Sequence, residues 1–139
     1  MFNRIMVPVD LEHVDQLGKA LDTAVHLAKE DDATLFFVAI STETPGAAAS
    51  TPEEFEQVLK QFADEQSRKY GLPIETRSLF SVDVARELHK RLLELADELE
   101  ADLIVMASHV PGIGDKLHLI GSHAGSIATH FSRSVFVVR

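Results

Sequence analysis

The sequence predicts an α/β fold: a single open five-stranded parallel sheet with helices on both faces. Short apolar runs, typical of strands buried on both faces, alternate with longer segments whose apolar residues recur at helical spacing. This alternation implies right-handed crossovers between parallel strands. A chain of 139 residues suits one core, so residues 1–139 are expected to form a single domain. The expected strands are Ile5–Val9, Leu35–Ile40, Ile74–Phe80, Leu103–Ala107 and Val135–Val138.

The N-terminal half begins with a buried strand over Ile5–Val9, whose pairing should loosen near its end because Pro8 has no N–H. An amphipathic helix and a second buried strand, Leu35–Ile40, follow, and the stretch from Ser41 to Thr51 is expected to be a loop. The apolar face of the first helix comprises Leu17, Leu21, Ala24, Val25 and Ala28.

Local chemistry predicts both ends of the second helix. Thr51 is suited to cap its start, with Pro52 in the first turn and Glu54 three residues after the cap. Gly71 is suited to end it. The strand Ile74–Phe80 is less hydrophobic and alternates in polarity, as expected for the edge of a sheet.

Two further helices precede the last two strands. The apolar face of the third comprises Ala85, Leu88, Leu92, Leu95 and Leu99. That of the fourth comprises Ala124, Ile127, Ala128 and Phe131. The spacing of each set is helical, which completes a pattern of four helices between five strands.

Composition narrows the function classes. The net charge of -9, without a basic stripe, argues against nucleic acid and against anionic membrane surfaces as partners. No apolar run approaches the ~20 residues of a membrane span. The absence of cysteine and the direct start into a strand, which leaves no room for a signal peptide, lead us to expect a cytoplasmic protein.

From Leu103 onward, the chain has the succession of strand, Gly-rich loop and helix that is typical of an anion-binding site. The apolar strand leads into Pro111-Gly112-Ile113-Gly114, and Gly121-Ser122 marks the start of a helix. Backbone N–H groups and the positive end of a helix dipole converge in such an arrangement. Ligands of doubly wound sheets bind where the strand order reverses, which would place Asp10 opposite this loop. Together these features indicate a nucleotide site.

The chain resembles the universal stress protein family over essentially its whole length. Four segments carry the resemblance: Val7-Pro8-Val9-Asp10, Met106-Ala107-Ser108-His109, Gly121-Ser122 and residues 134–139. The resemblance implies the strand order 3-2-1-4-5 and a regulatory module of the stress response that binds ATP or AMP, with Mg²⁺ possible beside bound ATP. The nucleotide-binding residues that it implies are Pro8, Val9, Asp10, Ala39, Met106, Ala107, Ser108, His109, Gly112, Gly121, Ser122 and His123.

Within this implied site, adenine lies near Ala39, ribose meets Asp10, and the phosphates run over the loop after Ala107 toward Gly121 and Ser122. The family motif is Gly-x-x-Gly, nine residues, then Gly-Ser or Gly-Thr. Here Ala107 and Val110 replace the two glycines, and ten residues separate Val110 from Gly121. Since a Cβ hinders close approach of backbone to phosphate, we expect weaker binding that favours AMP or ADP over ATP.

Each of these residues also has a simpler interpretation. Asp10 is suited to cap the first helix, Gly112 to shape a turn, and Gly121-Ser122 to start an ordinary helix. Two other function classes therefore stay open: a slow ATP hydrolase using the same pocket, and a protein of the same fold that acts only through protein contacts.

No catalytic or metal site is predicted. His109, His118 and His123 include no pair at helical i, i+4 spacing and no acidic ligand at a recognised spacing. The chain has no Gly-Lys-Ser or Gly-Lys-Thr, which excludes a P-loop. It also has no telling Ser-His-Asp set, and little supports His13 near Asp10 as a base.

The last strand, Val135–Val138, would leave an apolar edge exposed in a single chain. Pairing with a two-fold copy would cover that edge. The family resemblance implies the same homodimer, formed by antiparallel pairing of the last strands.

Overall fold

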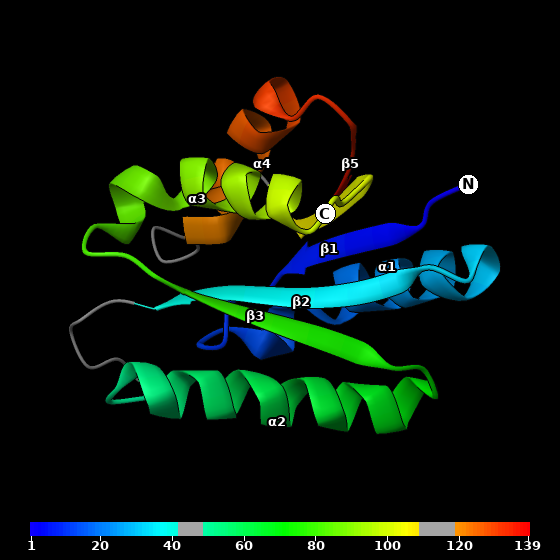
Figure 1. Cartoon of the computed structure of the whole chain (residues 1–139), viewed down its shortest axis with the longest axis horizontal. Helices are drawn as coiled ribbons and strands as arrows, with labels where there is room; N and C mark the ends of the chain where they lie inside the picture. The colour runs from blue at the N-terminus through cyan, green and yellow to red at the C-terminus, as the bar shows by residue number, and fades with distance from the viewer. Residues whose placement is uncertain (42–48, 109–118) are drawn as a thin grey trace.

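Five parallel strands form one sheet in the order β3-β2-β1-β4-β5 in the computed structural model, which describes residues 1–41, 49–108 and 119–139 (Figure 1). For Ala85 and residues 119–123 only the backbone is described. Both the fold class and the strand order are confirmed. The strands are β1 (Arg4–Pro8), β2 (Thr34–Ser41), β3 (Ile74–Phe80), β4 (Leu103–Ala107) and β5 (Ser134–Val138).

The helices cover the sheet in two layers. The side chains of α1 (Gly18–Asp31) and α2 (Pro52–Tyr70) pack on one face, and those of α3 (Val84–Glu98) and α4 (Leu119–His130) on the other. A short 3-10 helix, η1 (Val14–Gln16), precedes α1. Within the described ranges, no helix combines the length and the apolar character needed to cross a membrane.

Alternation along the central strands explains why they are apolar throughout. Phe37 belongs to the core beneath α1 and α2, where its ring lies 5.8 Å from that of Phe62. Its neighbour Phe36 belongs to the core beneath α3, and the Arg4 guanidinium lies 4.8 Å from its ring centre. Neither phenylalanine has any exposed surface. A strand with a helical layer on each side cannot place polar residues on either face.

The predicted ends of α2 are confirmed. Thr51 Oγ1 accepts a hydrogen bond from the Glu54 N–H at 3.1 Å, and the Glu54 carboxylate accepts from the Ser50 N–H and hydroxyl. The bonds from Ser50, its N–H first, lower the pKa of Glu54. Gly71 follows the helix at φ 71°, the left-handed conformation that glycine adopts without a Cβ penalty.

The two edge strands differ in character. On β3, Glu75 and Arg77 are exposed and alternate with half-buried residues, so the prediction of a polar edge strand is confirmed. On β5, two large apolar side chains are exposed: Phe136 to 47% and Val137 to 36%. The outer edge of β5 is therefore the more hydrophobic of the two.

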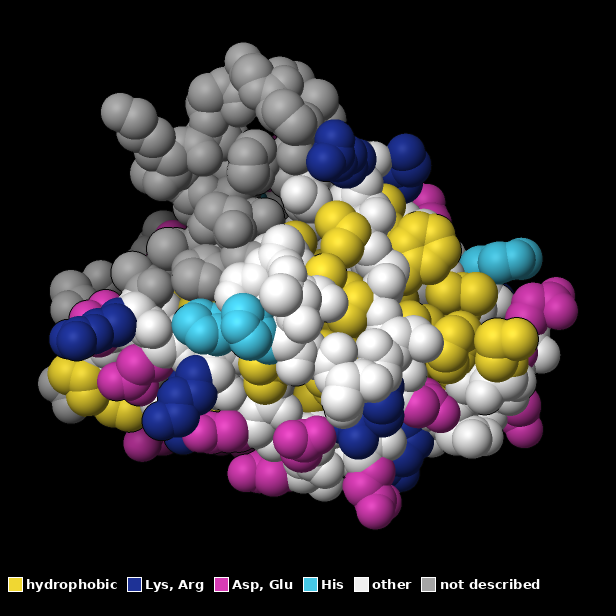
Figure 2. Space-filling view, turned by 90° about the horizontal axis from the view of Figure 1, so that it is seen from above, with side chains coloured by type: hydrophobic (Ala, Val, Ile, Leu, Met, Phe, Trp, Pro, Cys, Tyr) yellow, Lys and Arg dark blue, Asp and Glu magenta, His cyan; other side chains and the backbone are white. Residues whose placement is uncertain are grey.

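The outer surface of α3 and α4 carries polar links between the two helices. The His89 and His130 ring centres lie 6.2 Å apart, and Arg133 Nη2 lies 2.7 Å from Asp97 Oδ1. Figure 2 shows two histidine side chains next to each other on this face. These contacts join α3 to α4 and to the turn after it.

Tyr70, the only tyrosine of the chain, links the end of α2 to α1. Its hydroxyl donates a hydrogen bond to Asp22 Oδ1. Burial, and then the hydrogen bond and charge of Asp22, raise the pKa of Tyr70 to about 12 from its ordinary 10.0. The neutral phenol is thus the form that the folded chain prefers.

The Tyr70–Asp22 contact predicts a measurable alkaline titration. Because the folded pKa is raised, the stabilisation is present below pH 10.0 and is lost as the pH rises toward about 12. Asp22→Asn removes the charge but not the burial, so the pKa of Tyr70 should fall yet stay above 10.0. Absorbance of the phenolate measures it without interference, since the chain has no tryptophan. Asp64→Asn, at an exposed position of α2, is the control; equal pKa values in both variants would contradict the assignment.

Candidate functional site

The sheet opens between β1 and β4 at their carboxyl ends. The register of β1 with β2 extends to the pair Pro8–Val38, and the Val9 N–H donates to the Val38 carbonyl at 2.8 Å. The register of β1 with β4 contains only the pairs Ile5–Leu103 and Met6–Ile104. Pairing therefore loosens on the β4 side, as predicted from the missing N–H of Pro8. This opening lies where the strand order reverses.

Asp10 follows β1 at this opening and organises the turn after it. Its Oδ1 accepts a hydrogen bond from the Glu12 N–H at 3.0 Å, and its Oδ2 lies 2.9 Å from His13 Nδ1. Its backbone carbonyl accepts from the His13 N–H at 3.1 Å. The side chain stays 22% exposed. An aspartate that bonds the N–H two residues on is typical of turns.

The interpretation of Asp10 as the cap of the first helix is wrong. The helix α1 begins at Gly18, and its N-cap residue is Leu17, which makes no side-chain capping bond. The intervening residues form the Asp10 turn and η1, so the carboxylate bonds the turn instead.

At the end of β4, the predicted site residues differ in how deeply they are buried. Met106 is completely buried beneath α3 and α4, whereas Ala107 and Ser108 are half-buried. The Ser108 N–H donates to the Val138 carbonyl at 2.7 Å, which extends the β4–β5 ladder by one residue. The Ser108 N–H is thus engaged within the sheet.

Four predicted residues have side chains in the core. Pro8, Val9, Ala39 and Met106 are all buried, Val9 and Ala39 to 1% exposure. Their side chains therefore do not face the opening. Among the described side chains, those at the opening that can bond a ligand come from Asp10 and Ser108, with His13 beside Asp10.

Only some of the remaining predicted residues lie within the described ranges. His109 and Gly112 lie outside the described residues. Gly121, Ser122 and His123 belong to α4, which runs from Leu119, so the first two lie in the first turn of the described helix.

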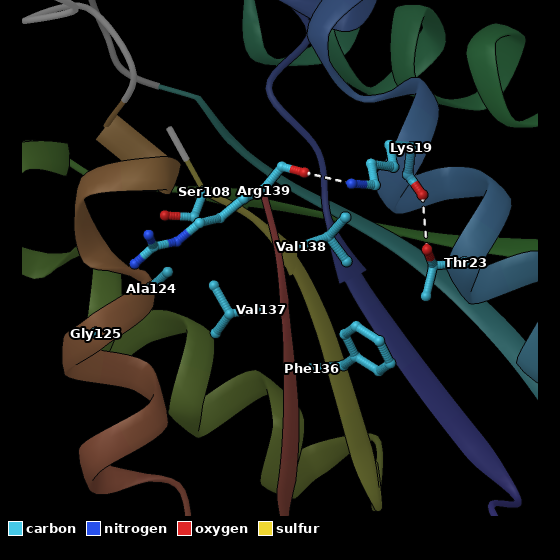
Figure 3. A pocket seen from close by; sticks show the side chains of 9 residues that line it. All are labelled: Lys19, Thr23, Ser108, Ala124, Gly125, Phe136, Val137, Val138 and Arg139. Atoms are coloured by element: carbon cyan, nitrogen blue, oxygen red, sulfur yellow. Dashed lines mark hydrogen bonds between the residues drawn. The ribbon is translucent and has the colours of Figure 1, made fainter. Parts of the chain in front are cut away.

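A cavity of about 690 Å³ lies on the far side of β4 from Asp10, between α1, α4 and β5 (Figure 3). Lys19 Nζ donates to the Arg139 carbonyl at 2.9 Å, and the Arg139 side chain extends toward Ser108. Ser108 is the predicted site residue that also lines this cavity. Its full lining is Lys19, Thr23, Ser108, Ala124, Gly125, Phe136, Val137, Val138 and Arg139.

Sequence reasoning missed the part played by His13. Its imidazole pairs with the Asp10 carboxylate and is 24% exposed. The i, i+3 spacing of the two residues was the available signal, but it gives a contact only once the turn is formed. Across the described ranges, no three His, Asp or Glu side chains converge in a way that could hold a metal ion.

Comparison with known proteins identifies the family. A model of the Universal stress protein family matches residues 1–139. Universal stress protein G of Escherichia coli O157:H7 is 30% identical over 148 residues, covering 100% of both chains. A universal stress protein crystallised in complex with cAMP superposes with a TM-score of 0.69 at 23% identity, covering 99% of this chain and 97% of that one. One from Archaeoglobus fulgidus in complex with dAMP gives 0.64 at 21% identity, covering 99% and 98%. The chain therefore belongs to the universal stress protein family.

Proposed function

We propose that the protein is a regulatory module of the stress response that binds an adenine nucleotide at the opening between β1 and β4. The observation that carries this proposal is the carboxylate of Asp10, which stands partly exposed at the point where the strand order reverses. Two family members of the same fold have been crystallised with adenine nucleotides, cAMP and dAMP. In keeping with its lack of cysteine, we propose a cytoplasmic location.

The residues around the opening fit the parts of a nucleotide. The Asp10 carboxylate keeps lone pairs beyond its two internal bonds and can accept ribose hydroxyls. The adenine would lie beside the ends of β1 and β2, where the side chains of Val9 and Ala39 point into the core. Ala107, Ser108 and the first turn of α4 can meet the phosphates.

Of the possible nucleotides, AMP is the proposed ligand. Ala107 is half-buried and carries a Cβ where the family motif has its first glycine. A side chain at that point limits the approach of backbone to a long phosphate chain. The fit is therefore better for one phosphate than for three, and Mg²⁺ would be needed only with ATP.

Removing the Asp10 carboxylate should weaken AMP binding. Asp10→Ala loses a hydrogen bond to a charged group, so the affinity should fall by about 1.5–3 kcal/mol, which isothermal titration calorimetry can measure. Asp64→Ala removes one carboxylate from an exposed position of α2 and should bind AMP like the wild type. Equal affinities in Asp10→Ala and wild type would place the nucleotide elsewhere.

We propose further that two copies associate through β5. The strand lies at one end of the sheet, and it exposes Phe136 on the α1 side and Val137 on the α4 side. A second copy pairing antiparallel to β5 would satisfy its outer hydrogen-bonding groups and cover both side chains. It would also close the cavity that these residues line.

A charged substitution on the edge strand β5 tests the dimer. The wild type should have about twice the chain mass of 15.3 kDa in multi-angle light scattering at micromolar concentration. Val137→Lys should shift it to the monomer, because pairing would bury an unpartnered ammonium group. Val82→Lys changes a 76% exposed valine before α3 and should remain dimeric. A monomeric wild type would refute the dimer.

A further inference from the structure

Three hydrogen bonds make the turn after β1 a rigid holder for one carboxylate. The Glu12 N–H bonds Asp10 Oδ1 at 3.0 Å, and His13 Nδ1 lies 2.9 Å from Asp10 Oδ2. The His13 N–H bonds the Asp10 carbonyl at 3.1 Å, which closes the turn. Both carboxylate oxygens thus have a partner from the same short segment.

This double hold restricts how the carboxylate can rotate. The terminal torsion of an aspartate is otherwise broad, with no sharply preferred angle. The backbone bond from Glu12 fixes one oxygen, but a single bond leaves the plane of the carboxylate free to swing around it. The second bond, from the His13 side chain, defines that plane.

The burial of the pair makes the hold effective. Asp10 is 22% and His13 24% exposed, so both groups are mostly shielded from solvent. Partial shielding strengthens a hydrogen bond to a charged group relative to one at an open surface. The part of Asp10 that stays exposed is what a ligand can reach.

We infer that His13 is a positioning residue that makes Asp10 selective for a ligand with a ribose diol. This inference rests on the proposed nucleotide function. A diol places two hydroxyl groups at a fixed separation, and a carboxylate held in one plane offers its remaining lone pairs in fixed directions. An unheld carboxylate can turn to satisfy a single hydroxyl, so it discriminates less between ribose and deoxyribose.

Three substitutions separate positioning from mere support of the turn. His13→Ala removes the side-chain bond to Asp10. His13→Asn places an amide N–H near the position of Nδ1 and should restore that bond. His13→Gln places its amide near the position of Nε2 and should not. His26, an exposed histidine of α1, provides the matched control in His26→Ala.

The measurement is the affinity of each protein for AMP, 2′-deoxy-AMP and 3′-deoxy-AMP by isothermal titration, with melting temperatures recorded alongside. The wild type should prefer AMP over each deoxy analogue by about tenfold, the value of one good hydrogen bond. That preference should fall to about threefold or less in His13→Ala and His13→Gln. It should persist in His13→Asn and His26→Ala.

Several results would overturn the inference. A preference for AMP that is unchanged in His13→Ala, whatever its melting temperature, would show that His13 only supports the turn. If His13→Ala does not fold, equal preferences in His13→Asn and His13→Gln decide against positioning. AMP binding that depends on Asp10 but ignores the ribose hydroxyls would refute this inference alone. Failure of the wild type to bind AMP would refute the proposed function as well.

Discussion

The unequal pairing of β1 with its two neighbours is the constraint on which the rest of the site depends. The strand follows β2 to its last residue but follows β4 only through Met6. From β1 the chain crosses over to β2 on one side, while β4 arrives from α3 on the other, so the segments after β1 and β4 diverge. Pro8, which has no N–H to give, stands where the separation begins. Asp10 and Ser108 flank the resulting opening.

Most of the fold could be predicted because its determinants are local or periodic. Phe36 and Phe37 are consecutive and both buried, as expected for a strand with a helical layer on each side. Thr51 and Gly71 delimit α2 through bonds within a few residues of themselves. The order of the strands needed more, namely the rule that parallel crossovers are right-handed and the resemblance to a known family.

The places of the candidate residues on the fold could be predicted, but their contacts could not. The apolar runs predict that Val9, Ala39 and Met106 are buried, and the structure confirms it. The turn after Asp10 illustrates the limit. Its bonds to Glu12 and His13 depend on backbone torsions that no apolar pattern encodes. The orientation of the Asp10 carboxylate therefore could not be predicted from this segment of mixed polarity between a strand and a helix.

For the proposed nucleotide, the charges around β4 favour one orientation. The chain carries a net charge of -9, and Asp10 adds an acidic group on the β1 side of the opening, where a phosphate would be repelled. Beyond β4, the Arg139 side chain extends toward Ser108, and Lys19 Nζ bonds the Arg139 carbonyl. The proposed ligand, with a neutral diol at one end and an anion at the other, is therefore expected to place its sugar at β1 and its phosphate at β4. In the proposed complex, the overall negative charge of the chain would be offset locally by the Arg139 side chain beside Ser108.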